Sequence, residues 1–146
     1  MPVSARIILL VEDSPDDEAL TLRALSRNNV GAQVVVVRDG VEALDWLAAA
    51  AEPPTLILLD LQLPKIDGLE VLRRLRANAR TALVPVVILT SSKEDRDRAG
   101  SYRGGANSYV QKPVDFAEFV EAVRQLGLYW LVLNQPPPDD ATPTPS

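Results

Sequence analysis

Residues 56–60 read Leu-Ile-Leu-Leu-Asp, a short apolar run that ends directly in an acid. Four similar runs occur along the chain, at Ile7–Val11, Val34–Val37, Val86–Leu89 and, more weakly, Ser108–Val110. Nearly continuous Val, Ile and Leu over four or five residues is typical of strands that are covered on both faces of a parallel sheet. We therefore expect five strands, of which Leu56–Leu59 is the third.

The segments between these runs have the features of helices. The clearest has apolar residues at spacings of i, i+3, i+4 and i+7, which share one helical face: Phe116, Phe119, Val120, Val123 and Leu126. Each segment also opens with a Ser or Asp that can cap the helix, followed three residues later by an acid that suits its positive first turn. These pairs are Ser14/Asp17, Asp39/Glu42, Asp67/Glu70, Ser92/Asp95 and Asp115/Glu118. Pro15 strengthens the first, because proline is favoured at the first helical position.

The alternation of strands and helices predicts an α/β protein of the (βα)₅ type. Right-handed crossovers would place helices on both faces of a doubly wound, five-stranded parallel sheet. Ligands of such folds bind beyond the carboxyl ends of the strands. The functional residues are therefore expected just after each apolar run.

Chemically active side chains follow four of the five runs. Glu12 and Asp13 follow the first, Asp60 follows the third, Thr90 ends the fourth, and Lys112 follows the fifth. Two carboxylates about 4 Å apart repel each other by roughly 4 kcal/mol at an effective dielectric constant near 20. One lysine cannot neutralise three acids, whereas a divalent cation can, and Mg²⁺ accepts one or two carboxylates together with waters and phosphate oxygens.

Composition excludes several other kinds of site. The 146 residues have 47% hydrophobic and 24% charged residues and a formal net charge of −5, and they include neither histidine nor cysteine. Zinc, haem and iron–sulfur sites and Ser-His-Asp or Cys-His catalysis are thereby disfavoured. The acidic net charge disfavours binding to nucleic acid. The first apolar run is too short to span a membrane. We expect a cytoplasmic location.

The order of these motifs resembles the receiver domains of bacterial response regulators, whose fold is flavodoxin-like (CheY-like). The resemblance covers about residues 6–126 and rests on Glu12-Asp13, Leu-Leu-Asp60-Leu-Gln-Leu-Pro64, Asp67-Gly68, Thr90-Ser91 and Lys112-Pro113. It implies that Asp60 accepts a phosphoryl group from a sensor histidine kinase. It also implies that Asp13 and Asp60 bind Mg²⁺ directly, Glu12 mostly through water and Gln62 through its backbone carbonyl.

The resemblance assigns further roles. Lys112 and Mg²⁺ would neutralise the transferring group, Thr90 would bind the phosphoryl group after transfer, and Tyr109 would swing inward as the threonine moves. A half-buried strand tyrosine is the alternative at that position. The Lys112–Pro113 bond is usually cis in this family. The fourth helix, expected over Lys93–Tyr102 with Ala99 and Tyr102 as its apolar anchors, should be one of the less stable elements.

The end of the chain differs in character from the domain predicted over residues 1–127. Residues 128–133 are apolar on every face: Leu128, Tyr129, Trp130, Leu131, Val132 and Leu133. We interpret residues 128–135 as a partner-binding arm of a homodimer, with a longer fifth helix as the alternative. Residues 136–146 are expected to be a flexible, proline-rich tail. The Tyr-Trp-Leu-x-Leu-Asn-x-Pro-Pro ending resembles stand-alone regulators that serve bacterial phytochrome kinases.

Particular positions in the sequence argue against other functions that use a similar fold. A haloacid-dehalogenase phosphatase needs a second aspartate two residues after the nucleophile, where this chain has Gln62. The first loop lacks the glycines of a dinucleotide-binding protein. No DNA-binding segment follows, so a transcription factor is not expected. A signalling protein that catalyses its own phosphoryl transfer and slow dephosphorylation, rather than an ordinary enzyme, is the favoured function. A non-phosphorylated adaptor on the same fold remains its alternative.

Overall fold

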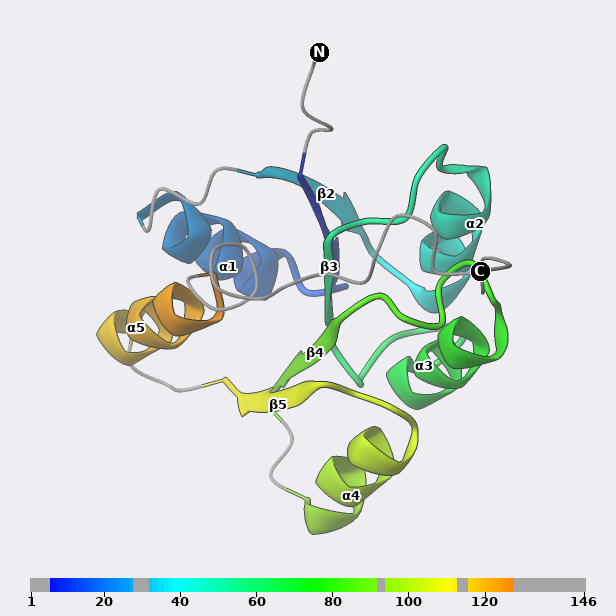
Figure 1. Ribbon diagram of the computed structural model, residues 1–146. Helices are drawn as coiled ribbons and strands as arrows, with labels where there is room; N and C mark the ends of the chain where they lie inside the picture. The colour runs from blue at the N-terminus through cyan, green and yellow to red at the C-terminus, as the bar shows by residue number, and fades with distance from the viewer. Residues whose placement is uncertain (1–5, 28–31, 92–93, 113–115, 128–146) are drawn as a thin grey trace, which may run out of the picture.

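The computed structural model describes residues 6–27, 32–91, 94–112 and 116–127 (Figure 1). Its strands are β1 (Ile7–Val11), β2 (Gln33–Val37), β3 (Leu56–Leu59), β4 (Val86–Thr90) and β5 (Ser108–Gln111). Its helices are α1 (Pro15–Arg27), α2 (Gly40–Ala49), α3 (Gly68–Ala77), α4 (Asp95–Arg103) and α5 (Phe116–Gly127). Within the described residues the expected alternation of strands and helices is confirmed.

All strand pairs are parallel, and the order across the sheet is β2-β1-β3-β4-β5. The chain moves outward from β1 to β2 and then crosses back to β3, so the order reverses between β1 and β3. In doubly wound sheets this reversal point is where ligands bind, at the carboxyl ends of the strands. Within the described ranges, no helix has the length and apolar character needed to cross a lipid bilayer.

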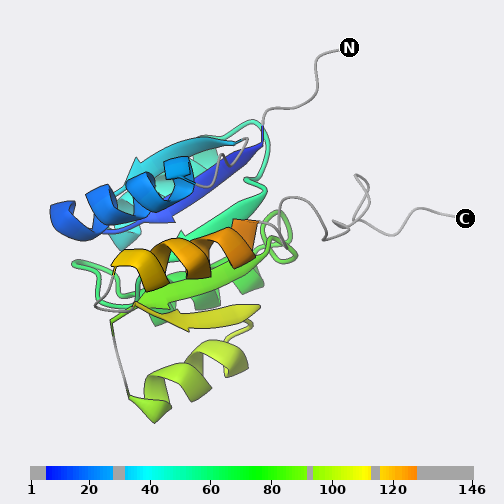
Figure 2. The same cartoon turned by 90° about the vertical axis from the view of Figure 1, so that its left-hand side faces the viewer.

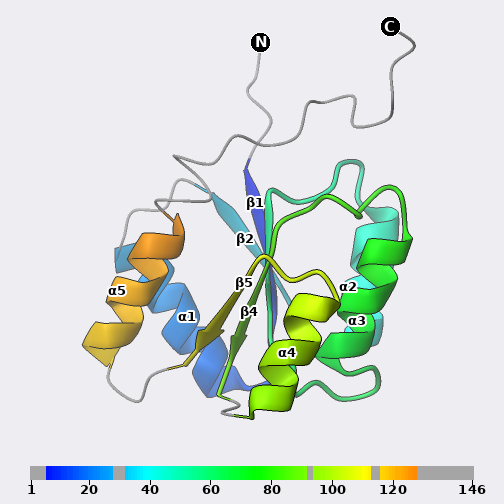
Figure 3. The same cartoon turned by 60° about the horizontal axis from the view of Figure 1, so that its bottom comes forward.

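Helices cover both faces of the sheet, as Figures 2 and 3 show: α1 and α5 lie on one side, and α2, α3 and α4 lie on the other. Alternate residues of each strand pack into the hydrophobic core on opposite sides of the sheet, because successive side chains point to opposite faces. Ile8 and Leu10 pack with Phe119 of α5, whereas Leu9 packs with Leu72 of α3. Burial on both faces explains why β1, β3 and β4 are continuously apolar.

Three of the predicted helix caps are present. The Ser14 hydroxyl accepts a hydrogen bond from the Asp17 amide at 3.3 Å, and Asp39 and Asp67 accept from the amides three residues later at 2.8 and 2.9 Å. Such bonds satisfy amides that have no partner within the helix. Each cap follows a strand directly or after one loop, so each sets where a helix leaves the sheet edge. The pairs that involve Ser92 and Asp115 lie outside the described residues.

The fourth helix differs from the prediction in its start and in its anchors. It begins at Asp95, two residues later than expected, after Glu94, whose side chain makes no capping bond. Ala99 is exposed and Tyr102 is 52% exposed, so neither anchors the helix. The buried residue is Ser101, whose hydroxyl donates to the Asp97 carbonyl at 2.8 Å. A small polar residue, Ser101, is therefore buried in this helix instead of the expected Ala99 and Tyr102.

Arg76 joins two loops at the sheet edge opposite the strand-end acids. Its guanidinium donates to the carbonyls of Thr81, Ala82 and Val84 after α3, and to Gly105 and the Asn107 side chain before β5. Burial lowers its pKa without a carboxylate partner among these contacts. A partly buried arginine bound to several carbonyls holds β4 and β5 in register.

Arg76→Met is expected to reduce the free energy of unfolding by about 1–3 kcal/mol, because several partly buried carbonyls lose their donor. Arg73→Met is the matched control. Arg73 is exposed and binds Glu70, and such surface pairs contribute about 0–1 kcal/mol. Urea unfolding of both variants measures the difference. Equal destabilisation would contradict a structural role for the Arg76 contacts.

Candidate functional site

Three carboxylates meet where the strand order reverses. The Glu12 amide donates to the Val37 carbonyl, and the Asp60 amide donates to the Val11 carbonyl, so backbone bonds continue the sheet past its strand ends. These bonds bring Glu12, Asp13 and Asp60 together. One oxygen of each lies within 4.8 Å of the others. Oxygen donors at this spacing suit a hard divalent cation, which fits a chain without histidine or cysteine.

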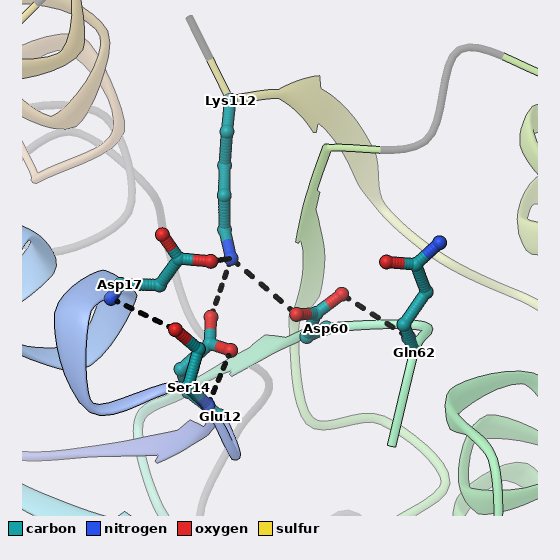
Figure 4. Close-up of polar contacts among 6 residues, drawn as sticks. All are labelled: Glu12, Ser14, Asp17, Asp60, Gln62 and Lys112. Carbon is teal, nitrogen blue, oxygen red and sulfur yellow. Dashed lines mark hydrogen bonds and ion pairs between the residues drawn. The ribbon is translucent and has the colours of Figure 1, made fainter. Parts of the chain in front are cut away.

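Lys112 reaches the same point from β5. Its amide donates to the Thr90 carbonyl at 2.7 Å, which extends the pairing of β4 with β5 by one residue. Its Nζ lies 2.5 Å from Glu12 Oε1, 3.0 Å from Asp17 Oδ2 and 3.4 Å from Asp60 Oδ2 (Figure 4). One ammonium therefore contacts three carboxylates in the described site. The net charge of this group of side chains remains negative.

Burial makes this negative charge costly. The side chains of Glu12, Lys112 and Asp60 are 1%, 6% and 8% exposed. Burial raises the pKa of Glu12 to about 7; the Lys112 hydrogen bond opposes the rise, and the charge of Asp60 adds to it. For Lys112, burial favours the neutral amine, but Glu12, Asp60 and Asp17 outweigh it and its pKa is raised. The lysine is thus a fixed cation, and the surplus negative charge is available to a metal ion.

The remaining predicted site residues lie around this centre. Thr90 is fully buried at the end of β4. The Gln62 amide donates to Asp60 Oδ1 at 3.2 Å, which orients the carboxylate, and its side chain is exposed. Tyr109 is half-buried and packs against the core layer on the α2–α4 side of the sheet. The roles of these three residues stay predictions.

Asp17 is the site residue that the sequence analysis missed. It was assigned to the capping pair of the first helix, yet its carboxylate lies 3.0 Å from the Lys112 ammonium. Side chains in a helix lean toward its N-terminus. An acid in the first turn of α1 therefore leans back over the carboxyl ends of the strands. Applied to residues 16–18, that directional rule identifies the acids that can reach the strand-end site.

Gly68 allows the loop after Asp60 to fold back on itself. Its amide donates to the Leu61 carbonyl at 3.0 Å, and an added Cβ would lie 2.3 Å from the Asp60 carbonyl oxygen and 2.6 Å from the Leu61 Cα. Both neighbours are backbone atoms, so they cannot move aside without displacing Asp60 itself. Glycine is required here by close approach of the backbone.

Gly68→Ala is accordingly expected to cost about 1–3 kcal/mol of stability, as overpacking does, and to slow the phosphoryl uptake that the sequence predicts at Asp60. Gly100→Ala is the control. A Cβ at Gly100 would meet the nearest Leu69 atom at 3.5 Å, an ordinary contact, and alanine favours the helix. Thermal melting and mass spectrometry report the two effects. A Gly68→Ala protein as stable as Gly100→Ala would contradict the close approach.

Several predictions fall on residues that the structure does not describe. These are the cis bond between Lys112 and Pro113, the apolar arm over residues 128–135 and the tail over residues 136–146. The alternative of a longer fifth helix falls there too, because the described part of α5 ends at Gly127.

Comparison with known proteins gives a family for the fold and the site. The model of the response regulator receiver domain matches residues 8–124, which includes every carboxylate described above. A curated relative is a probable methanogenesis regulatory protein, FilR2, of Methanothrix harundinacea. It is 39% identical over 135 residues, which are 90% of this chain and 87% of that protein.

Solved structures of similar proteins have the same architecture. The phosphorylated cyanobacterial phytochrome response regulator RcpA matches with a TM-score of 0.86 and 37% identity, over 92% of this chain and 99% of that one. The Mn²⁺-bound form of response regulator Rcp1 matches with a TM-score of 0.83 and 34% identity, over 90% and 99%. The bacteriophytochrome response regulator RtBRR is 50% identical over 92% and 85%, with a TM-score of 0.73.

Proposed function

The chain belongs to the response regulator receiver domain family, and from that premise we propose that it accepts a phosphoryl group on Asp60 from a sensor histidine kinase. The observation that carries this proposal is the position of Asp60. It is buried at the reversal point of the sheet, beside two further acids and the Lys112 ammonium. An aspartate in that setting is a nucleophile with its charge partners already in place.

The transfer follows from this geometry. A carboxylate oxygen of Asp60 attacks the phosphorus of a phosphohistidine, a P–O bond forms, and the P–N bond breaks with its electron pair going to the histidine nitrogen. Phosphoryl transfer needs mainly positioning and neutralisation of charge. Lys112 supplies one positive charge, and the Gln62 amide keeps the carboxylate oriented. Thr90, buried one residue beyond Leu89, offers a hydroxyl to the product.

We assign Asp13 and Asp60 as the direct carboxylate ligands of Mg²⁺, Glu12 as a ligand that acts mostly through water, and the Gln62 backbone carbonyl as an additional ligand. The three carboxylates provide an all-oxygen donor set, which is the chemistry that Mg²⁺ requires. When bound, Mg²⁺ would offset the charge on the phosphoryl group and on the acids around it. The Mn²⁺-bound form of Rcp1 supports a divalent ion in a similar protein.

Incubation with Mg²⁺ and acetyl phosphate tests the proposed function. Intact-mass measurement should find one added phosphoryl group, and the group should be lost slowly to water because the protein also catalyses hydrolysis of its own acyl phosphate. A chain that takes up none, with its fold intact by circular dichroism, would be the non-phosphorylated adaptor instead.

The partner we propose is a bacteriophytochrome-type sensor kinase in the cytoplasm. The 50% identity to the bacteriophytochrome regulator RtBRR supports this choice over other sensor kinases. Candidate kinases can be compared by their rate of transfer to the purified protein. Equal rates with phytochrome-type and unrelated kinases would remove the preference.

We also propose that residues 128–133 form a homodimer arm, since six consecutive apolar residues have no solvent-compatible face. Truncation after Gly127 should lower the sedimentation mass to that of a monomer and leave uptake at Asp60 intact. Trp130→Glu with Leu131→Glu should do the same by placing charge in a buried contact. Full-length protein that sediments as a monomer at high micromolar concentration would refute the arm. A large loss of thermal stability in the truncated chain would favour the longer fifth helix.

A further inference from the structure

The Lys112 ammonium has three N–H donors and contacts three carboxylates. The contacts to Glu12 and Asp17, both on the β1–α1 side, measure 2.5 and 3.0 Å, and the contact to Asp60 measures 3.4 Å. Figure 4 shows the ammonium between these acids, with Asp60 across the site from Asp17. The cation that must serve the phosphoryl group is thus held closer to other acids than to the nucleophile.

The three acids differ in what they lose when the lysine leaves. Glu12 is 1% exposed and Asp60 is 8% exposed, so each depends on protein partners for its charge. Asp17 is 38% exposed, and water can solvate its carboxylate without the lysine. Its backbone is anchored independently, because its amide donates to the Ser14 hydroxyl. Asp17 is therefore the partner that can release Lys112 at least cost.

We propose that Asp17 is a positioning residue, which holds the Lys112 ammonium on the α1 side of the site and releases it when a phosphoryl group arrives on Asp60. The inference rests on the proposed function and deepens it. A phosphoryl group adds nearly two negative charges and new acceptor oxygens beside a lysine whose donors are already shared among three acids. Phosphoryl uptake then includes breaking the Asp17 contact, so Asp17 restrains the reaction.

Asp17→Asn removes the charge and keeps a side-chain oxygen of nearly the same position. Uptake from acetyl phosphate at saturating Mg²⁺ is expected to become about twofold to fivefold faster, which is the range for loss of a partly exposed ion pair. The acyl phosphate should also survive longer, since Lys112 no longer has Asp17 as an alternative partner. Asp17→Glu keeps the charge and should stay within about twofold of the unaltered protein. Slower uptake by Asp17→Asn would overturn the inference.

Asp16→Asn is the matched control. Asp16 lies in the same helical turn, carries the same charge and is exposed. Among the described residues, the carboxylates that Lys112 contacts are instead those of Glu12, Asp17 and Asp60. The two variants change the net charge equally, so they have equal effects on general attraction of the anionic donor. Equal acceleration by Asp16→Asn and Asp17→Asn would mean that bulk charge acts, and no positioning role would remain.

A double-mutant cycle separates positioning from direct repulsion of the donor. In a Lys112→Ala background there is no ammonium to hold, so Asp17→Asn should change the uptake rate by less than about twofold. A full acceleration in that background would show that Asp17 repels acetyl phosphate directly and would overturn the inference. Absence of uptake by the unaltered protein would instead refute the proposed function, and the inference with it.

Discussion

Asp60→Asn is expected to abolish phosphoryl uptake from acetyl phosphate. The amide has the size of the carboxylate and can still accept the 3.2 Å hydrogen bond from the Gln62 amide, so the loop should keep its shape. Its oxygen, however, is a far weaker nucleophile, and the variant also loses one anionic ligand of the proposed metal site. Intact-mass measurement after prolonged incubation should find no added group.

Asp67→Asn provides the control in the same loop. Asp67 caps α3 through the Glu70 amide at 2.9 Å, and asparagine is an equally good capping residue. Because Asp67 lies outside the carboxylate cluster, this variant should take up the group as the unaltered protein does. Uptake by Asp60→Asn at an unchanged level would show that another carboxylate is the acceptor.

Asp60→Asn should also stabilise the fold in the absence of metal. The charge of Asp60 is one of the causes that raise the pKa of the buried Glu12, so removing it relieves repulsion between two buried acids. An increase of about 1 kcal/mol in the free energy of unfolding is expected, by analogy with other sites that trade stability for function. Urea unfolding with a chelator present measures it.

The sequence predicted those parts of the structure that depend on local patterns. Apolar runs located β1 and β3 to the residue, and capping residues such as Asp67 located the helix starts. The strand ends then located Glu12 and Asp60, because parallel strands bring their carboxyl ends to one edge. Each of these inferences requires only a few consecutive residues and one rule of geometry.

The parts that could not be predicted depend on contacts between distant segments. Asp17 and Lys112 are separated by 95 positions. The lean of helical side chains narrows the partners of the lysine to residues 16–18, but the local sequence does not tell which of these acids contacts it. Gly40 is similar: a Cβ there would lie 2.2 Å from the Ile66 carbonyl oxygen, a constraint set by a loop from another part of the chain. The anchors of α4 were wrong for the same reason, because apolar character alone does not tell which side of a short helix faces the sheet.

The second large effect concerns the different roles of Asp13 in Mg²⁺ binding and of Lys112 in phosphoryl transfer. Asp13→Ala is expected to weaken Mg²⁺ binding by about 10-fold to 100-fold, because it removes an anionic ligand from a small set. Lys112→Ala should leave Mg²⁺ binding at least as tight as before. The lysine contacts Asp60 Oδ2 at 3.4 Å, so its removal frees an oxygen of a direct metal ligand and leaves Asp13 unchanged.

Loss of Lys112 should nevertheless slow phosphoryl uptake, by about 10-fold or more, because the transferring group loses a fixed positive charge. The fold should tolerate the change. The hydrogen bond from Lys112 lowers the pKa of Glu12, so without it that pKa rises further and the buried acid becomes neutral instead of remaining an unpaired charge. Calorimetric titration with Mg²⁺ and uptake kinetics at saturating Mg²⁺ separate the two roles. If Lys112→Ala lost metal as completely as Asp13→Ala, the lysine would be holding the metal ligands in place, and the roles assigned to the two residues would be wrong.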